Sequence, residues 1–263
     1  MDLGLRGKVA IVTASSRGIG KGIARVMLQE GARVMLLARS IDELKGTALE
    51  LSRDTGGDVA YVQGDLTNRD DVMRLIEETR GIMGPVDILI YNTGPPKPGL
   101  FSELTFDDWD YAVKLLLLSA VWLTKGVVDD MVKRGWGRLI YITSLTLRQP
   151  VSNLVLSNTV RLSLAGLVKS LAGEYGPKGI TANGVMQGYV MTDRVRRLAE
   201  DEAKRSGASI EEVLRSMAKD IPVGRYGNPE EIGYLVAFLA SDKASYINGS
   251  MILIDGGFVK CVP

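Results

Sequence analysis

Short apolar runs that alternate with helical segments constrain the fold of this chain more than any other feature. Six such runs occupy residues 8–14, 33–38, 59–65, 86–94, 137–144 and 180–188. They are continuously apolar, which is typical of parallel strands buried on both faces of a sheet. Alternating strands and helices imply right-handed crossover connections. The sequence therefore predicts a single α/β domain, a doubly wound parallel sheet with helices on both faces.

The segments between these runs carry helix signals. Residues 21–30 place apolar side chains on one face, and the pattern stops at Gly31. Ser40 and Glu43 have the spacing of a capping box, in which each side chain bonds the backbone N–H of the other residue. Residues 152–176 have the pattern of one long amphipathic helix.

Residues 193–222 differ in character, because they are highly charged and helical with a break at Gly207. In an open α/β sheet, a helical insertion after a late strand overhangs the ligand crevice. We expect a lid over the substrate, and the alternative is a solvated pair of helices.

Composition excludes several classes of function. Lys and Arg number 32 against 31 Asp and Glu, a net charge of +1 that gives no reason to expect nucleic acid or an anionic membrane as partner. The chain has no histidine, which excludes a Ser-His-Asp triad and removes the commonest metal ligand. Cys261 is the one cysteine, so neither an intramolecular disulfide nor a cysteine metal site is expected, and no metal is required.

Targeting signals are not expected either. The first residues carry charges at Asp2, Arg6 and Lys8 around only a short apolar run, unlike a signal peptide. The apolar stretch 115–123 is too short to span a bilayer and is predicted to be a buried helix. We expect a soluble, cytoplasmic protein.

A glycine-containing loop follows the first apolar run and opens the first helix. Gly18 and Gly20 allow a tight turn and a close approach of the backbone to a phosphate, which the helix N-terminus would bind. Ser15, Ser16 and Arg17 add hydroxyl groups and a cation. This loop in its strand–loop–helix context predicts a dinucleotide site.

The end of the second apolar run bears on the choice of coenzyme. An acidic residue there would bind a ribose 2′-hydroxyl group, but the chain has Ala38, Arg39 and Ser40. Because Arg39 can clamp a phosphate, NADP(H) is favoured over NAD(H). The alternative is that Arg39 is only a solvent-facing charge.

Several stretches together resemble those of a known family. They are TASSRGIG, GDLT, YNTG, GRLIYITS, ITANGVMQGYVMTD and GRYGNPEEIGYLVAFLASDKASYINGSMILIDGG. On these the chain resembles the short-chain dehydrogenases/reductases, close to the ketoacyl-carrier-protein reductase and glucose dehydrogenase types. The resemblance covers nearly the whole length and implies a Rossmann-like fold, a final strand near the end of the chain and a homotetramer or homodimer. It also implies a small carbonyl or alcohol substrate.

The motifs and the resemblance together predict the residues that hold the coenzyme. Asp65 is expected to accept from the adenine amino group, and Asn92 and Gly94 to line the crevice. The predicted set is Thr13, Ser15, Ser16, Arg17, Gly18, Ile19, Gly20, Arg39, Ser40, Asp65, Leu66, Asn92, Gly94, Arg161, Gly188 and Thr192.

The chain departs from the family at the residues that carry catalysis. The glycine that follows the first threonine is Ala14, and the Asn, Ser, Tyr and Lys of the catalytic tetrad fall on Leu116, Ser144, Ser157 and Arg161. A serine hydroxyl group is a far weaker acid than a tyrosine, whose reference pKa is about 10. An arginine stays protonated and cannot relay protons.

The usual proton path therefore cannot operate, although Ser144 and Arg161 can still bind a carbonyl oxygen and stabilise its developing charge. Tyr189 is a candidate proton donor, and Tyr141 and Tyr91 are two more, each with packing as its alternative role. LSNTVR resembles a branch of ketoacyl-reductase-like proteins that carries serine and arginine at these positions. The leading hypothesis is an oxidoreductase with a non-standard active site. The alternatives are an inactive NADP(H)-binding sensor or partner subunit, and a scaffold with an empty crevice.

Overall fold

The computed structural model describes residues 1–261, apart from the side chain of Arg194. The described chain contains one seven-stranded parallel sheet. Its strands are β1 (Val9–Thr13), β2 (Arg33–Ala38), β3 (Val59–Gln63), β4 (Ile88–Tyr91), β5 (Gly137–Ile142), β6 (Ile180–Gln187) and β7 (Met251–Ile254). Their spatial order is β3-β2-β1-β4-β5-β6-β7. The predicted doubly wound sheet is confirmed, and the seventh strand is the final one that the resemblance implied.

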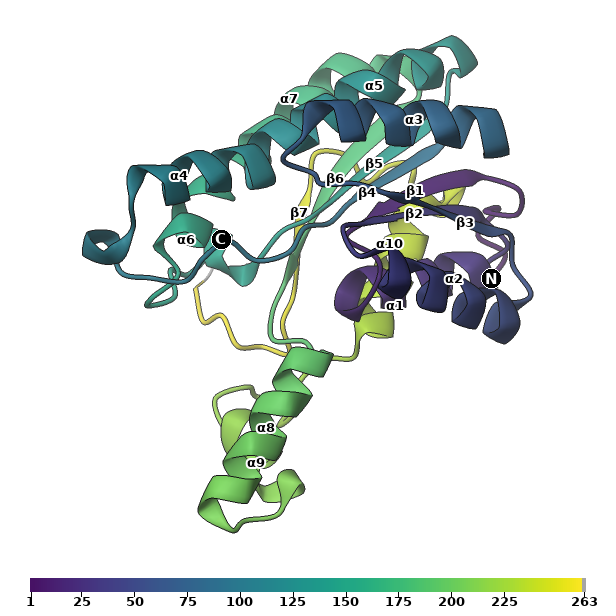
Figure 1. The fold of residues 1–263 in the computed structure, drawn as a ribbon. Helices are drawn as coiled ribbons and strands as arrows, with labels where there is room; N and C mark the ends of the chain where they lie inside the picture. The colour runs from purple at the N-terminus through teal and green to yellow at the C-terminus, as the bar shows by residue number, and fades with distance from the viewer. Residues whose placement is uncertain (262–263) are drawn as a thin grey trace.

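Helices cover both faces of the sheet (Figure 1). One face carries α1 (Gly18–Gln29), α2 (Ile41–Thr55) and α10 (Pro229–Ala240). The other carries α3 (Arg69–Met83), α4 (Phe106–Val113), α5 (Ser119–Arg134), α6 (Val155–Val160) and α7 (Ser163–Tyr175). Strand order reverses between β1 and β4, and in such sheets the crevice outside the carboxyl ends of the strands at this point binds ligands.

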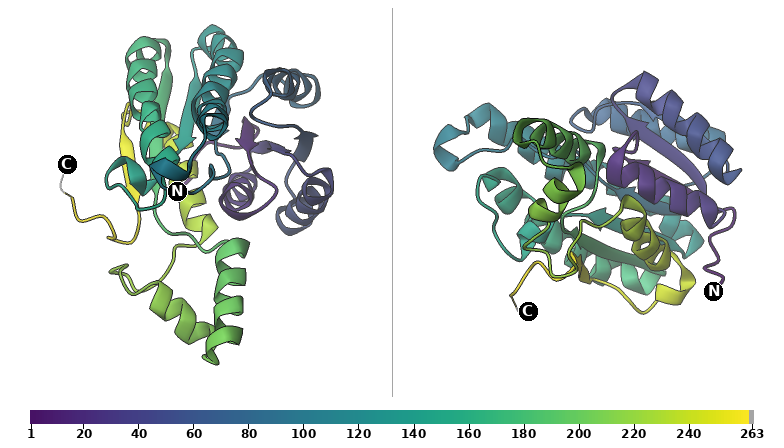
Figure 2. Two further views of the ribbon diagram at one scale, coloured as in Figure 1. Left: turned by 60° about the vertical axis from the view of Figure 1, so that its left-hand side comes forward. Right: turned by 90° about the horizontal axis from the view of Figure 1, so that it is seen from below.

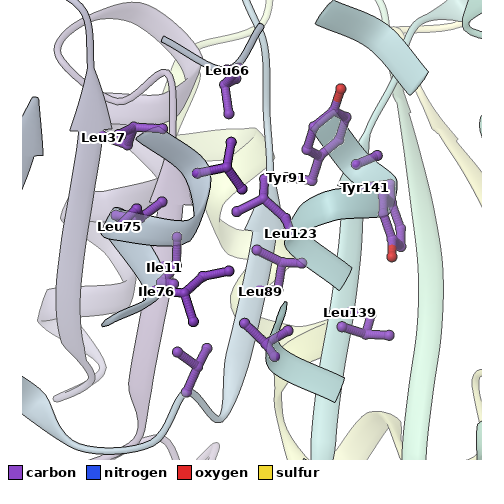
Figure 3. Packing of buried hydrophobic residues seen from close by; sticks show 14 of the residues in the cluster. Ile11, Leu37, Leu66, Leu75, Ile76, Leu89, Tyr91, Leu123, Leu139 and Tyr141 are labelled. Atoms are coloured by element: carbon purple, nitrogen blue, oxygen red, sulfur yellow. The ribbon is translucent and has the colours of Figure 1, made fainter. Parts of the chain in front are cut away.

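The continuously apolar strands supply two cores at once. Successive side chains of a strand point to opposite faces, so Val9 and Ile11 of β1 belong to one hydrophobic cluster, and Ala10 and Val12 to the other. Figure 3 shows the first cluster, in which Ile11, Leu89 and Leu139 of neighbouring strands meet helix residues such as Leu75 and Leu123.

The leucine run belongs to a long continuous helix that begins directly after Thr105. Helix α4 leads through a π-helical turn, Lys114–Leu118, into α5. The whole segment Phe106–Arg134 is long and apolar enough to cross a membrane by length and composition alone. Half of its most apolar window is buried inside the fold. Leu115, Leu116 and Leu123 lie in the first core cluster, so the expected buried helix is confirmed.

The single long helix predicted over 152–176 is wrong. The structure has α6 and α7 instead, separated by a turn at Arg161 and Leu162. The hydroxyl group of Ser163 donates to the carbonyl of Val160 at 2.6 Å, and the Leu164 N–H bonds the carbonyl of Arg161 three residues back. Such short-range bonds replace the regular helical ladder locally.

The capping box predicted at the start of α2 forms only in part. The Ser40 hydroxyl group accepts from the Glu43 N–H at 3.3 Å. The reciprocal bond from the Ser40 N–H to the Glu43 carboxylate is absent among the described residues, because that carboxylate bonds Ser16 and Arg17 instead. Helix α1 begins at Gly18, three residues before the predicted start at residue 21.

Two helices project from the body of the domain (Figures 1 and 2). They are α8 (Asp193–Ser206) and α9 (Ile210–Met217), separated at Gly207, which has a φ of +75°. A small cluster of their own, Ala199, Ala203 and Val213, holds them together.

Candidate active site

A cavity of about 780 Å³ lies at the carboxyl ends of the central strands, where the strand order reverses. Its walls come from the loop after β1, the ends of β2, β3 and β4, and the start of α8. The lining residues are Ala14, Ser16, Arg17, Gly18, Ile19, Leu37, Ala38, Arg39, Ser40, Glu43, Gly64, Asp65, Leu66, Asn92, Thr93, Gly94, Pro95, Tyr111, Leu115, Thr192, Asp193, Arg197, Leu198 and Asp201.

The loop between β1 and α1 is shaped to take a phosphate group. Gly18 has a φ of +56°, and a Cβ atom on Gly20 would lie 2.3 Å from the Ala14 carbonyl oxygen, so no other residue fits there without a shift. The first turn of α1 contains no acidic residue, and its N-cap, Arg17, makes no side-chain cap. The first N–H groups of the helix therefore face the cavity with the positive end of the helix dipole.

Three of the predicted loop residues lie behind the cavity wall. The Thr13 hydroxyl group donates to the Asn92 carbonyl at 2.7 Å and accepts from the Asn92 N–H at 2.8 Å, which ties β1 to β4. The Ser15 hydroxyl group is fully buried, donates to the Val12 carbonyl and accepts from the Leu37 N–H. These residues and Gly20 position the loop, while Ser16, Arg17, Gly18 and Ile19 face the cavity.

The end of β2 brings together charged groups of both signs. Arg39 is exposed and makes no ion pair among the residues that the structure describes. Glu43, on the first turn of α2, accepts from the Ser16 hydroxyl group at 3.0 Å and pairs with Arg17 at 3.3 Å. All four residues line the cavity together with Ser40.

Asp65 and Asn92 form the next part of the wall. Asp65 Oδ1 accepts from both the N–H and the hydroxyl group of Thr67 at 2.8 Å. Its Oδ2 makes no hydrogen bond within residues 1–261, so one carboxylate oxygen is left for a ligand. The Asn92 amide donates to the carbonyls of Thr13 and Ala14, both at 3.3 Å.

Ser157 on α6 and Arg161 in the turn that ends it are in direct contact. Arg161 is only 6% exposed, its Nε donates to the Ser157 hydroxyl oxygen at 3.1 Å, and its Nη2 donates to Thr93 Oγ1 at 3.2 Å and to the Gly94 carbonyl at 3.4 Å. Burial lowers the pKa of this guanidinium below its usual value, and the nearby Tyr91 opposes that shift. No carboxylate pairs with Arg161 in the described chain. Its Nη1 makes no hydrogen bond with the described residues and is not sealed from solvent.

Ser144, just after β5, is not hydrogen-bonded to this pair in the described chain. Its hydroxyl group accepts from the Thr146 N–H at 3.2 Å, and the side chain is half-buried. The structure describes no hydrogen bond from Ser144 to Ser157 or Arg161. The hydroxyl oxygen of Thr146 is fully buried there without a partner.

The three candidate tyrosines differ in their access to a substrate. Tyr91 and Tyr141 are fully buried with ring centres 5.9 Å apart, and Figure 3 shows their hydroxyl groups pointing in opposite directions. Tyr91 donates to the Leu115 carbonyl at 2.7 Å, and Tyr141 bonds Thr124. Burial raises the pKa of both phenols, which makes them poorer acids. Tyr189 is 37% exposed.

Sequence reasoning therefore found much of the cavity but not all of it. Of the predicted residues, Thr13, Ser15, Gly20, Ser144, Ser157, Arg161, Gly188 and Tyr189 do not line it. Tyr189 packs edge-on against Tyr226 and Phe258, and Gly188 packs against Asp255. Glu43 and Tyr111 were missed as lining residues, and α8 supplies Arg197, Leu198 and Asp201. Glu43 was predicted only as part of a capping box. No signal in the sequence pointed to its place in the cavity, because Arg17 of the glycine loop lies 26 residues away.

A family model described as enoyl-(acyl carrier protein) reductase matches residues 13–259, from the end of β1 to beyond β7. The chain belongs to the short-chain dehydrogenase/reductase family of oxidoreductases. A 3-oxoacyl-[acyl-carrier-protein] reductase of Aquifex aeolicus is 32% identical over 98% of this chain and 99% of its own length.

Solved structures agree with this assignment over the whole fold. L-sorbose reductase from Gluconobacter frateurii, complexed with NADPH and L-sorbose, superposes with a TM-score of 0.95 and 33% identity, covering 100% of both chains. An NADPH-bound short-chain oxidoreductase from Pseudomonas aeruginosa, described as containing an atypical catalytic centre, gives a TM-score of 0.88 and 28% identity over 97% of this chain and 98% of its own.

Proposed function

We propose that this protein is an NADP(H)-dependent carbonyl reductase or alcohol dehydrogenase whose active site uses Ser144, Ser157 and Arg161. The observation that carries the proposal is the cavity at the switch point, where a free helix N-terminus and two exposed arginines, Arg17 and Arg39, face one space. That donor set matches a pyrophosphate and a ribose 2′-phosphate.

The residues present fit such a coenzyme. The first N–H groups of α1 and Thr192 would hold the pyrophosphate, and Asp65 the adenine. The 2′-phosphate would lie among Ser16, Arg17, Arg39 and Ser40. The relatives with NADPH in their described structures support this choice. When bound, the coenzyme supplies or accepts a hydride at the carbonyl carbon, which is chemistry that the chain only has to position.

Arg161 is the group suited to the charge that develops on the carbonyl oxygen. Its Nε and Nη2 are fixed by Ser157, Thr93 and Gly94, which leaves Nη1 to donate. A guanidinium held in a water-poor site stabilises an oxyanion far more than one in water. Ser144 is assigned a second hydrogen bond to the same oxygen.

The proton that completes the alcohol has to come from another source. Ser157 is too weak an acid, and Tyr91 and Tyr141 are buried with raised pKa values. We assign it to water, with Tyr189 as the alternative donor because it is the one of the three that reaches solvent. We place the chain in an atypical branch with Ser-x-x-x-Arg, in keeping with the Pseudomonas relative described as having an atypical catalytic centre.

Helices α8 and α9 are proposed to act as a lid. Arg197, Leu198 and Asp201 already line the cavity, while the two helices project from the body on few connections. We also propose a cytoplasmic homotetramer or homodimer acting on a small molecule. Leu162 is 53% exposed beside the long apolar helices, an arrangement suited to a partner subunit.

A second candidate is a coenzyme-binding sensor or partner subunit without turnover. It is favoured by one observation: no acid of suitable pKa contacts Ser157 or Arg161 in the described chain.

Fluorescence titration of the purified protein with NADPH and with NADH tests the proposed function. We expect NADPH to bind more tightly, and Arg39→Asp to weaken NADPH binding by roughly tenfold or more, since a charged hydrogen bond contributes about 1.5–3 kcal/mol. Failure of both coenzymes to bind would exclude the enzyme and the sensor alike and leave a scaffold.

Turnover then separates the two candidates. Ketoses and 3-oxoacyl thioesters are the first carbonyl compounds to try, because relatives act on L-sorbose and on 3-oxoacyl groups. Coenzyme oxidation that is lost in Ser144→Ala identifies an enzyme. Activity that appears only in the Ser157→Tyr, Arg161→Lys double variant identifies a binder.

A further inference from the structure

Glu43 is a carboxylate placed where the sequence predicted none. It lies on the first turn of α2 and lines the cavity beside Arg17, Arg39 and Ser40. Its Oε2 accepts from the Ser16 hydroxyl group at 3.0 Å, and its Oε1 pairs with Arg17 Nη1 at 3.3 Å. Both carboxylate oxygens therefore occupy donors that the coenzyme site would need.

This placement is not explained by helix capping. The capping interaction at the start of α2 uses the backbone N–H of Glu43, not its carboxylate. A negative charge in a first helical turn is favourable, but Asp42 supplies one at the preceding position and makes no hydrogen bond or ion pair with the described residues of the loop after β1. The carboxylate of Glu43 is thus directed at Ser16 and Arg17 specifically.

The pair is weak enough to be displaced. Arg17 is 64% and Glu43 44% exposed at the side chain, and an ion pair in such a position is screened by water. A phosphate carries more charge than a carboxylate and offers three acceptor oxygens, so it would compete well for Arg17. The displaced carboxylate would remain close to the phosphate and repel it.

We propose that Glu43 is a specificity-determining residue that competes with the ribose 2′-phosphate for Ser16 and Arg17, and so narrows the preference for NADPH over NADH that Arg39 sets. The proposal rests on the proposed function, because it requires the coenzyme to bind in this cavity. Arg39, which has no ion-pair partner among the described residues, provides the basal preference, and Glu43 reduces it.

Calorimetric titration with 2′,5′-ADP and with 5′-AMP isolates this effect from catalysis. The two probes differ only in the 2′-phosphate, and neither carries a nicotinamide. Glu43→Gln keeps the size of the side chain and is expected to raise 2′,5′-ADP affinity roughly fivefold, the range for losing one partly screened charge interaction. The affinity for 5′-AMP should change less than about twofold.

Asp42→Asn is the matched control, since it removes the same charge from the same helical turn without contacting Ser16 or Arg17. It should leave both affinities within about twofold of the starting protein. In an Arg17→Met background the gain from Glu43→Gln should largely disappear, because the contested cation is then absent.

Each outcome decides the matter. A selective gain for 2′,5′-ADP in Glu43→Gln, absent in Asp42→Asn, supports the proposal. Unchanged or weakened 2′,5′-ADP binding overturns it while leaving the proposed function standing, provided that the starting protein binds this probe. Absence of binding by the starting protein and by Glu43→Gln would overturn both.

Discussion

The exposed arginines of the cavity and the buried arginine bonded to its wall are held in opposite ways. At the coenzyme end of the cavity, Arg17 and Arg39 are exposed, and the ion pair of Arg17 with Glu43 is open to solvent. Arg161, which bonds Thr93 and Gly94 of the cavity wall, is 6% exposed and fixed by three uncharged partners. Exposed cations attract a charged ligand and release it easily. Burying a cation without a counterion costs free energy. Such a cation is expected where negative charge develops next to it during a reaction.

This contrast predicts a large change in turnover and a small change in stability at Arg161. Arg161→Met removes the oxyanion donor and is expected to lower kcat/KM by roughly 10²–10³. The free energy of unfolding should stay equal or rise by about 1 kcal/mol, because a desolvated charge without a carboxylate partner is removed. Steady-state kinetics and chemical denaturation measure the two quantities.

Arg161→Lys is the control for that result, since it keeps a cation but loses the planar set of donors. It should recover part of the lost rate. Full activity in Arg161→Met would show that the buried arginine is a structural residue. The proposed difference in role between the buried and the exposed arginines would then be wrong.

An intermediate effect is expected where α8 meets the coenzyme end. Arg197→Ala removes a cation that lines the cavity and should weaken NADPH binding by roughly threefold to tenfold, more at low salt than at high salt. Arg196→Ala takes the same charge from the neighbouring position, which faces another surface depression with Glu211 and Arg215. Equal effects of the two changes, measured by fluorescence titration, would contradict a specific contact between α8 and the coenzyme.

The smallest effect is expected at Ala14, which has a φ of +49° at the position where the family has glycine. The left-handed conformation costs an alanine about 1–2 kcal/mol, and glycine avoids it but loses more entropy on folding. Ala14→Gly should therefore stabilise the chain by only about 0.5 kcal/mol, without altering NADPH affinity. Thermal unfolding measures the change. A loss of stability would mean that the Ala14 methyl group contributes packing that outweighs its strain.

Much of the fold followed from the sequence because its signals are local. The β2 range was predicted to the residue, since the apolar run that marks it lies within one element. The break at Arg161 and Leu162 was missed because it depends on a hydrogen bond of Ser163, which an amphipathic pattern does not reveal. The position of the glycine loop was likewise predicted. The sequence did not reveal that the Ser15 hydroxyl group accepts a hydrogen bond from the Leu37 N–H of the neighbouring strand.

Candidate site residues also divide into those with local roles, which the sequence revealed, and those with distant partners, which it did not. Gly18 and Gly20 were recognisable because their roles arise from backbone sterics within one loop. The partners of Glu43 were not, because Ser16 and Arg17 lie 27 and 26 residues away and were brought to it by the pairing of β1 with β2.

The sequence by itself determined the order of strands and helices, the doubly wound class and the residue types available for chemistry, histidine being absent. These properties depend on periodicity and composition. Tertiary structure alone decided which charges are buried and which are paired. Arg161 and Arg39 are the same residue type, yet one is enclosed by Ser157, Thr93 and Gly94 and the other is exposed. Burial depends on contacts between segments far apart in the chain, and it is burial that sets the strength of a charge in the site.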